Sequence, residues 1–182
     1  MILGSRDEKR GDEAVGFLTS KDPKWADRLM MLAIDVSSEE SVTMAAETVA
    51  SSFEADAKPL YGIINNAGIG SSSIGLEPTL QVNTWGIHRV CEAFIPLLEA
   101  SGRIVNVTSA AGPNFVEAAD DLTRTMLTDP DVQWDAVEEY MNRSISESKD
   151  SASTTSGLGN AYGLSKACAN ALTLILAREN PG

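Results

Sequence analysis

Short apolar runs alternate along this chain with segments of helical pattern, and this alternation constrains the fold more than any other feature. Apolar runs occupy residues 29–36, 60–65 and 102–108, and residues 1–3 have the character of a strand end. The helical patterns between and after them cover residues 7–19, 38–55, 80–100 and 160–179, and Ser37 or Ser38 is expected to cap the second helix. This order predicts an α/β fold with a parallel sheet of buried strands.

The composition bounds the class of protein. With 182 residues, of which 43% are apolar, the chain has enough core for a single domain over 1–182. The net charge of −12 disfavours nucleic acid and anionic membrane as partners. No apolar run approaches the roughly 20 residues that span a bilayer, and the early charged residues do not fit a signal peptide. We therefore expect neither nucleic-acid nor membrane binding.

The cysteines and the histidine exclude further classes. Cys91 and Cys168 are far apart and fall in helical segments, so we expect reduced core thiols in a cytoplasmic protein. His88 is the single histidine, which excludes a His-rich metal site, and we expect it to be a packed helix residue. No GxSxG motif occurs, which disfavours a Ser-His-Asp hydrolase.

Residues 112–159 do not follow the alternation. Two amphipathic segments, 116–127 and 132–144, flank an Asp-Pro-Asp sequence, and a Ser/Thr-rich run over 144–156 is expected to be mobile. We interpret 112–159 as a helical insertion over one end of the sheet. Its Trp134, Tyr140 and Met141 either line a substrate pocket or anchor the insertion.

Charge is distributed unevenly. Residues 1–28 hold six of the 14 basic residues, whereas residues 111–150 hold ten acidic residues against three basic ones. Two solvated surfaces would explain this distribution. Alternatively, the basic amino-terminal end binds an anion.

The segment around Tyr162 and Lys166 carries the clearest chemical signal. Residues four apart on a helix share a face, so this hydroxyl and this ammonium can approach each other. A nearby ammonium favours the phenolate form of a tyrosine. Such a pair can give a proton to a carbonyl oxygen or take one from an alcohol. Alone the pair is a weak signal, since a surface Tyr and Lys on one helix would look the same.

Other polar or small residues fall where the strands are predicted to end. Asp35 closes one strand, the 65–68 sequence Asn-Asn-Ala-Gly follows another, and Ser109 follows the next. Asn83 lies in the helix between the last two. Ligands of open α/β sheets bind at the carboxyl ends of the strands, so these residues define one candidate site.

At this point the sequence resembles the classical short-chain dehydrogenases/reductases. The shared motifs, in the family's order, are IDV at 34–36, NNAG at 65–68, VN at 82–83, VTS at 107–109 and YGLSK at 162–166. The resemblance implies a Rossmann-like, doubly wound parallel sheet. The 53-residue spacing between Ser109 and Tyr162 resembles the monomeric carbonyl-reductase branch, whose helical insertion lies beside the substrate site. We accordingly expect a monomer, because such an insertion covers the surface that tetrameric members use.

The resemblance also implies catalytic roles. Tyr162 would protonate the carbonyl oxygen as hydride arrives from the nicotinamide, and Lys166 would favour the phenolate and hold the nicotinamide ribose. Ser109 would hydrogen-bond the substrate oxygen. Asn83 would hold a water that relays the proton towards Lys166.

The cofactor-binding residues follow from the same resemblance. Asp35, with Val36 beside it, would contact the adenine, and Asn65, Ala67 and Gly68 would line the adenosine ribose and the floor of the site. Arg6 stands near the position where NAD-binding members carry an acidic residue, and an arginine there suits the 2′-phosphate of NADP. Arg10 could support Arg6, so we expect NADP(H). An ordinary solvated arginine would look the same.

The sequence departs from the family in one important respect. It contains no glycine-rich TGxxxGxG loop, which in the family follows the first strand and holds the pyrophosphate. The chain begins at the family's second strand and ends before its sixth, so the sequence resembles the middle of a longer protein. The sheet should then lack the strand between the second and the fourth. We expect this chain alone to fold poorly or to bind cofactor weakly.

Three hypotheses for function remain. The first is an NADPH-dependent carbonyl reductase of a small-molecule ketone or aldehyde. The second is a secondary-alcohol dehydrogenase that uses the same residues. The third is a non-catalytic fragment that acts as a binding module.

Overall fold

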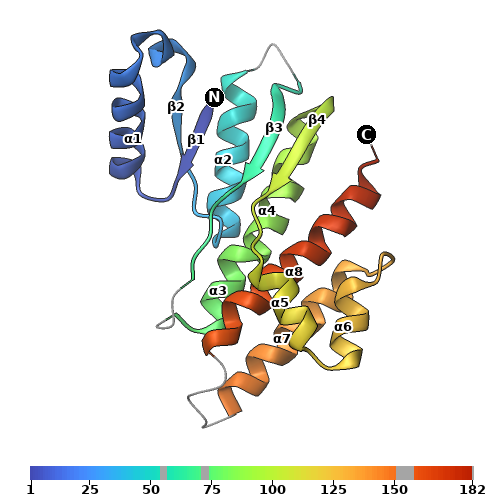
Figure 1. Cartoon of the computed structure of the whole chain (residues 1–182). Helices are drawn as coiled ribbons and strands as arrows, with labels where there is room; N and C mark the ends of the chain where they lie inside the picture. Colours follow the sequence, from blue (N-terminus) through green and yellow to red (C-terminus); the bar gives the residue numbers. More distant parts are fainter. Residues whose placement is uncertain (54–56, 71–73, 151–157, 182) are drawn as a thin grey trace.

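A computed structural model describes residues 1–53, 57–70, 74–150 and 158–181 (Figure 1). Strands and helices alternate as the sequence predicts. The first half contains β1 (Ile2–Ser5), α1 (Glu8–Lys21), β2 (Met30–Ala33), α2 (Glu39–Ser52), β3 (Leu60–Asn65), α3 (Leu76–Asn83) and α4 (Trp85–Phe94). The second half contains β4 (Leu98–Asn106), α5 (Ala111–Ala118), α6 (Asp121–Thr128), α7 (Trp134–Asp150) and α8 (Leu158–Glu179). Two 3-10 helices, Pro23–Arg28 and Ile95–Leu97, complete the fold.

The sheet consists of two separate parallel pairs. β1 pairs with β2 and β3 pairs with β4, and within the described residues no ladder joins β1 to β3. The two pairs nevertheless share one hydrophobic cluster, in which Leu32 of β2 and Ile63 of β3 pack with Val49 of α2 and Phe94 of α4. The expected α/β sheet, incomplete in its middle, is therefore confirmed.

The expectation that the strand at 60–65 is buried on both faces is wrong. Ile63 is 7% exposed, but Tyr61 is 65% and Ile64 71% exposed, and Val105 of β4 is also exposed. Helices cover the face that carries Ile63. The opposite face of the β3–β4 pair has no such cover among the described residues.

The prediction of a single helix over 80–100 is also wrong. α3 begins at Leu76, earlier than expected, and the helix breaks at Thr84, which has φ −125° and ψ −62°. α4 then ends at Phe94, and β4 begins at Leu98, within the range expected to be helical. The cap of α2 is as expected, since the Ser38 side chain accepts from the N–H of Ser41.

The described part of the insertion contains three helices, where the sequence predicted two amphipathic segments. α5 ends at Ala118 and α6 begins at Asp121, because the Asp120 carboxylate accepts from the N–H of Thr123 and caps a new helix. α7 continues to Asp150, so residues 144–150, expected to be mobile, are helical. Residues 151–156 of that run lie outside the described residues.

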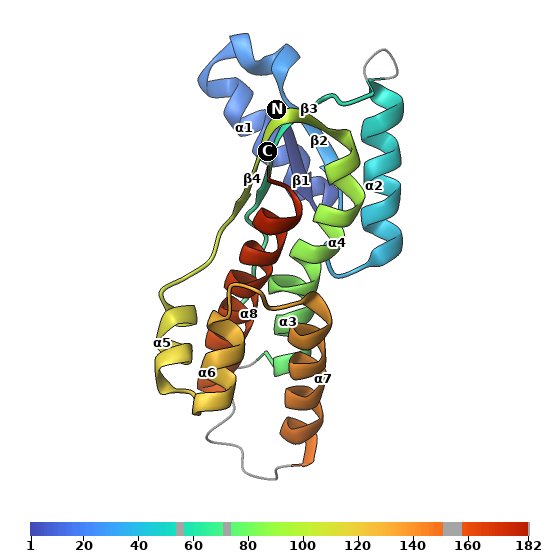
Figure 2. The same cartoon turned by 90° about the vertical axis from the view of Figure 1, so that its right-hand side faces the viewer.

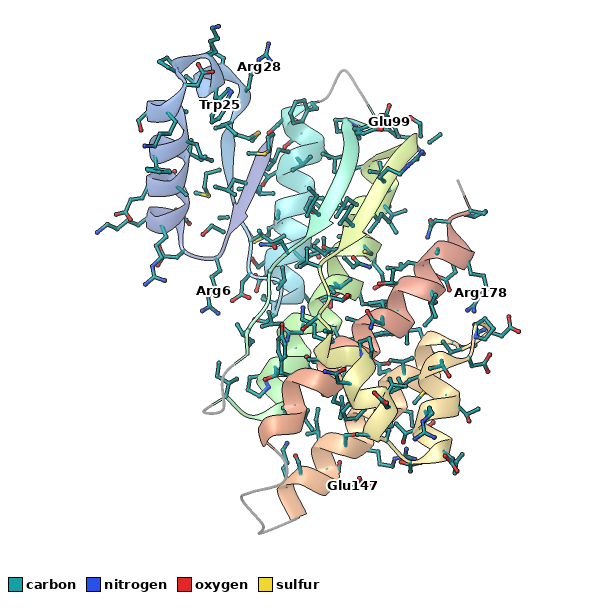
Figure 3. The ribbon with its side chains drawn as sticks, viewed as in Figure 1. Arg6, Trp25, Arg28, Glu99, Glu147 and Arg178 are labelled. Atoms are coloured by element: carbon teal, nitrogen blue, oxygen red, sulfur yellow. The ribbon has the colours of Figure 1, made fainter. Side chains whose placement is uncertain are left out.

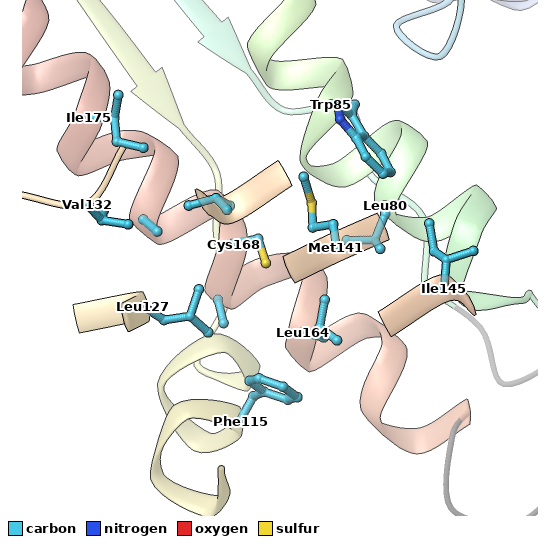
Figure 4. Packing of buried hydrophobic residues seen from close by; sticks show 13 residues of the cluster. Leu80, Trp85, Phe115, Leu127, Val132, Met141, Ile145, Leu164, Cys168 and Ile175 are labelled. Atoms are coloured by element: carbon cyan, nitrogen blue, oxygen red, sulfur yellow. The ribbon is translucent and has the colours of Figure 1, made fainter. Parts of the chain in front are cut away.

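A second hydrophobic cluster fixes the insertion on the rest of the fold. Met141 of α7 is fully buried among Leu80 of α3 and Leu164 and Cys168 of α8 (Figure 4). Viewed from the side, α7 runs beside α3, with α6 between α5 and α7 (Figure 2). The insertion is thus an integral layer of the helical end of the molecule.

Both cysteines are buried and unbridged, as expected for core thiols. Burial raises the pKa of Cys91 to about 11 and also raises the pKa of Cys168. Neither is therefore a thiolate near neutral pH. Among the described residues, no helix combines the length and the apolar character needed to cross a bilayer.

Candidate active site

Lys166 is a buried cation at the centre of the candidate site. Its side chain is 4% exposed, and its Nζ donates a 2.8 Å hydrogen bond to the carbonyl oxygen of Val107, just beyond β4. The Nζ lies 5.7 Å from the centroid of the Tyr162 ring, one helical turn earlier on α8. Burial lowers the pKa of Lys166. The structure thus places a proton-carrying group next to a phenol.

Asn83 lies at the end of α3 and is fully buried. Its Oδ1 accepts from the N–H of Ile69 at 2.8 Å, and its Nδ2 donates to the carbonyl oxygen of Ile69 at 2.8 Å. The same Nδ2 donates to Oγ of Ser165 at 3.0 Å. One carboxamide therefore ties the segment after β3 to the part of α8 that carries Tyr162 and Lys166.

Ser109 reaches the same region through close packing of α5 on α8. Its Oγ accepts from the N–H of Ala111 at 3.2 Å. The carbonyl oxygen of Ala111 would lie 3.1 Å from a Cβ atom at Gly163, next to Tyr162. A Cβ atom at Gly112 would likewise lie 3.0 Å from the carbonyl oxygen of Lys166. A side chain at either glycine would push α5 away from α8, so this close packing holds the start of α5, which directly follows Ser109, against the Tyr162–Lys166 segment.

The segment after β3 lies against the side chains of both Tyr162 and Lys166. A Cβ atom at Gly70 would lie 2.6 Å from Cδ2 of Tyr162, so the Tyr162 ring rests directly on this backbone. A Cβ atom at Gly68 would lie 3.6 Å from Nζ of Lys166. Sequence reasoning selected Gly68 but missed Gly70 and Ser165. The Gly-Ile-Gly sequence at 68–70 could have pointed to Gly70. The position of Ser165 directly before Lys166 could have pointed to Ser165.

Asn65 differs from the other predicted residues because its side chain points inwards. It is 7% exposed and donates to Oδ1 of Asn106 at 2.8 Å and to Sγ of Cys91 at 3.4 Å. Its carboxamide therefore joins β3 to β4. At this strand end, a ligand can therefore reach the exposed residues Ala67 and Gly68 but not the Asn65 side chain.

Arg6 and Asp35 follow the carboxyl ends of the paired strands β1 and β2. The Asp35 carboxylate accepts from the Ser37 hydroxyl at 2.6 Å and from the Ser37 N–H at 2.9 Å. These bonds and the charge of Arg6 lower the pKa of Asp35. Arg6 is exposed at the carboxyl end of β1, below the strand in Figure 3, and β3 and β4 point in the same general direction.

Val36 takes a packing position beside this pair. A Cβ atom at Gly86 would lie 2.9 Å from Cγ2 of Val36, and the Val36 carbonyl oxygen accepts from Nη1 of Arg89 at 3.3 Å. Val36 therefore fixes the segment that follows β2 against α4.

These residues fit two parts of a nicotinamide dinucleotide. The Lys166 ammonium has three N–H donors, of which the Val107 bond uses one, and the adjacent Gly68 leaves the backbone open to a ribose. The exposed Arg6 guanidinium suits a phosphate near the adenine end. The pyrophosphate between them has no glycine-rich loop in this sequence.

Trp134, Tyr140 and Met141 act mainly as anchors of the insertion. Met141 is core, and the Trp134 ring stacks on His88 of α4 with centroids 4.0 Å apart. Trp134 lines a hollow of about 570 Å³ between α4 and α7, and Tyr140 lines one of about 550 Å³ between α6 and α7. Neither hollow is lined by Tyr162 or Lys166.

Comparison with known proteins identifies the family. The family model described as short chain dehydrogenase matches residues 1–119. (+)-Neomenthol dehydrogenase of Arabidopsis thaliana is 30% identical over 213 residues, which cover all of this chain and 70% of that enzyme. Carbonyl reductase [NADPH] 3 of Rattus norvegicus is 27% identical, and the match covers 98% of this chain and 65% of that one.

A solved structure shows the same fold. Salutaridine reductase from Papaver somniferum matches with a TM-score of 0.84 and 26% identity, over 99% of this chain and 74% of that one. The family match covers the chain from β1 to α5, a part that contains Arg6, Asp35, Asn83 and Ser109. The chain belongs to the short-chain dehydrogenase family of oxidoreductases.

Proposed function

We propose that this protein is an NADPH-dependent reductase that converts a small-molecule ketone or aldehyde into an alcohol. The observation that carries this proposal is the position of Lys166, buried and fixed on Val107 beside the Tyr162 ring. A buried ammonium next to a phenol supports proton transfer to a carbonyl oxygen. The bound cofactor supplies the hydride.

In the proposed reaction each side chain has a separate task. The Tyr162 hydroxyl gives its proton to the substrate oxygen, and the Ser109 hydroxyl donates a hydrogen bond to that oxygen. Lys166 holds the nicotinamide ribose and, with its lowered pKa, exchanges protons more readily than an exposed lysine. The water relay proposed for Asn83 is restricted, because both N–H groups of its carboxamide already have acceptors. Among its side-chain atoms, only Oδ1 keeps a lone pair for a water.

Arg6 supports the choice of NADP(H). Its guanidinium is exposed beside Asp35, and a planar fork of N–H donors suits a 2′-phosphate. The name of the rat relative, carbonyl reductase [NADPH] 3, agrees with this choice. In our proposal Arg6 therefore selects NADPH over NADH.

Two further properties belong to this proposal. We propose a monomer, because α7 packs on both α3 and α8 and covers the surface that other family members use to associate. We propose a cytoplasmic location, because both cysteines are buried and unbridged.

The proposal is tested by NADPH oxidation in the presence of menthone and other cyclic ketones. Menthone is chosen because it is the ketone that corresponds to the alcohol in the name of the relative (+)-neomenthol dehydrogenase. We expect wild-type turnover, and Tyr162→Phe should reduce it by about 10²- to 10⁴-fold, the usual contribution of a general acid. Tyr61→Phe is the matched control, because Tyr61 is exposed on β3 and lies outside the site. Equal rates for wild type and Tyr162→Phe would overturn the proposal, and so would a lack of turnover with every carbonyl tested.

A further inference from the structure

Ser165 is a fully buried polar residue next to Lys166, and the reaction proposed above gives it no task. Its Oγ donates to the carbonyl oxygen of Tyr162 at 2.8 Å and accepts from Nδ2 of Asn83 at 3.0 Å. The hydroxyl therefore has two directed partners, one on its own helix and one on α3. Because a hydroxyl has a single proton, the bond to Tyr162 leaves its oxygen free to act as the acceptor for Asn83.

These bonds belong to a closed path of contacts around Tyr162. Ser165 holds Asn83, and Asn83 holds both the N–H and the carbonyl oxygen of Ile69. Ile69 is followed by Gly70, on whose backbone the Tyr162 ring rests. The path thus begins at Ser165 on α8, runs through Asn83, Ile69 and Gly70, and ends at the ring of Tyr162 on the same helix.

Loss of the Ser165 hydroxyl would open this path at one point. One N–H of Asn83 would be left without its buried acceptor, and the carboxamide could then rotate away from Ile69. The Ile69–Gly70 backbone would no longer be fixed against the ring. The helix itself would keep its backbone hydrogen bonds, because the bond from Ser165 to Tyr162 is only an addition to them.

We propose that Ser165 is a positioning residue, which acts through Asn83 to hold the Ile69–Gly70 backbone and thereby the ring of Tyr162. Its role in catalysis rests on the proposed function. Its role in fixing Ile69 is independent of that function, because the hydrogen bonds that would fix Ile69 need neither substrate nor cofactor.

Thr84 provides a matched control at the same junction. It is fully buried, and its Oγ1 donates to the carbonyl oxygen of Ser165 at 2.9 Å. It joins α8 to the break between α3 and α4, but among the described residues its hydroxyl makes no hydrogen bond to Asn83 or Ile69. Thr84→Val removes an equally buried hydroxyl and keeps the shape of the side chain.

The first measurement is hydrogen exchange at the Ile69 N–H in the whole chain. Ser165→Ala should speed this exchange at least tenfold relative to wild type, because the Asn83 oxygen that accepts from the Ile69 N–H becomes mobile. Thr84→Val should stay within about twofold of wild type. The proposal is overturned if Ser165→Ala leaves the exchange unchanged, or if both variants speed it equally.

The second measurement is the steady-state kinetics of carbonyl reduction. Ser165→Ala should lower kcat at least tenfold with little change in KM, whereas Thr84→Val should change neither by more than about twofold. In an Asn83→Ala background, Ser165→Ala should have no further effect on kcat or on Ile69 exchange. An additive effect would contradict action through Asn83. If wild-type protein has no activity, the proposed function fails and the exchange measurements still decide this inference.

Discussion

Nδ2 of Asn83 lies 3.0 Å from Oγ of Ser165, although 82 positions separate these residues in the chain. The contact joins the end of α3 to the segment of α8 between Tyr162 and Lys166. Asn83 also holds Ile69, in the segment after β3 that lies against the side chains of Tyr162 and Lys166. The candidate site is therefore assembled by tertiary packing of α3, α8 and this segment.

Arg6→Ala should weaken NADPH binding more than NADH binding. The exposed guanidinium can pair with a 2′-phosphate that NADH lacks, and a charge-assisted bond of about 1.5–3 kcal/mol corresponds to at least tenfold in affinity. Isothermal titration of both cofactors measures the difference. Arg28→Ala is the control, because Arg28 is exposed at the opposite end of the β1–β2 pair (Figure 3). A similar loss for both cofactors, or for both variants, would refute the role of Arg6.

Ser37→Ala should destabilise the protein in a pH-dependent way. The Ser37 bonds lower the pKa of Asp35 below its ordinary value of about 3.9. This stabilisation is complete above that value and is lost as the pH falls through the lower pKa of the folded state. We expect a loss of about 1 kcal/mol at pH 7 that shrinks towards zero in acid.

Urea unfolding between pH 7 and pH 2 checks this prediction. Ser52→Ala is the control, because the Ser52 hydroxyl donates to a backbone carbonyl oxygen of Thr48 that does not titrate. Its effect should not vary with pH. A pH-independent loss for Ser37→Ala would show that the Asp35 bond is not the cause.

Met141→Ala should lower the free energy of unfolding by about 2–5 kcal/mol, because it leaves a cavity in a fully buried position. Met44→Ala should cost much less, since Met44 is 59% exposed on α2. Chemical denaturation of both variants gives the comparison. If the two losses are equal, Met141 does not anchor the insertion to α3 and α8.

Gly70→Ala should reduce the turnover number at least tenfold without unfolding the protein. The new methyl group would lie 2.6 Å from a Tyr162 ring atom, so the ring or the backbone must move. Gly16→Ala should leave turnover unchanged, because a Cβ atom at that position on α1 would point into open space. Kinetics and circular dichroism on both variants test this, and normal turnover of Gly70→Ala would contradict the contact.

The sequence allowed the α/β order, the capping of α2 by one of Ser37 and Ser38, and the proximity of Tyr162 and Lys166 to be predicted, because each follows from local patterns. The break at Thr84 could not be predicted, because the α3–α4 region reads as one continuous amphipathic pattern. Its backbone turn is accompanied by a contact with Ser165 on α8, far away in sequence.

The exposure of the β3–β4 pair was missed for a similar reason. An apolar run such as 60–65 indicates a strand, but burial of both faces depends on which elements cover it. Here Ile63 packs on helices and Ile64 does not. The inward turn of the Asn65 carboxamide was equally hidden, because Asn106 and Cys91 are its neighbours only in the folded state.

Transfer of a labelled hydride tests the central claim most directly. The protein is incubated with menthone and NADPH carrying deuterium at the transferred position of C4, and the alcohol is analysed by mass spectrometry. We predict one deuterium on the carbinol carbon, and at least a hundredfold less labelled alcohol with Tyr162→Phe. An alcohol without deuterium, or equal labelling with Tyr162→Phe, would contradict the account.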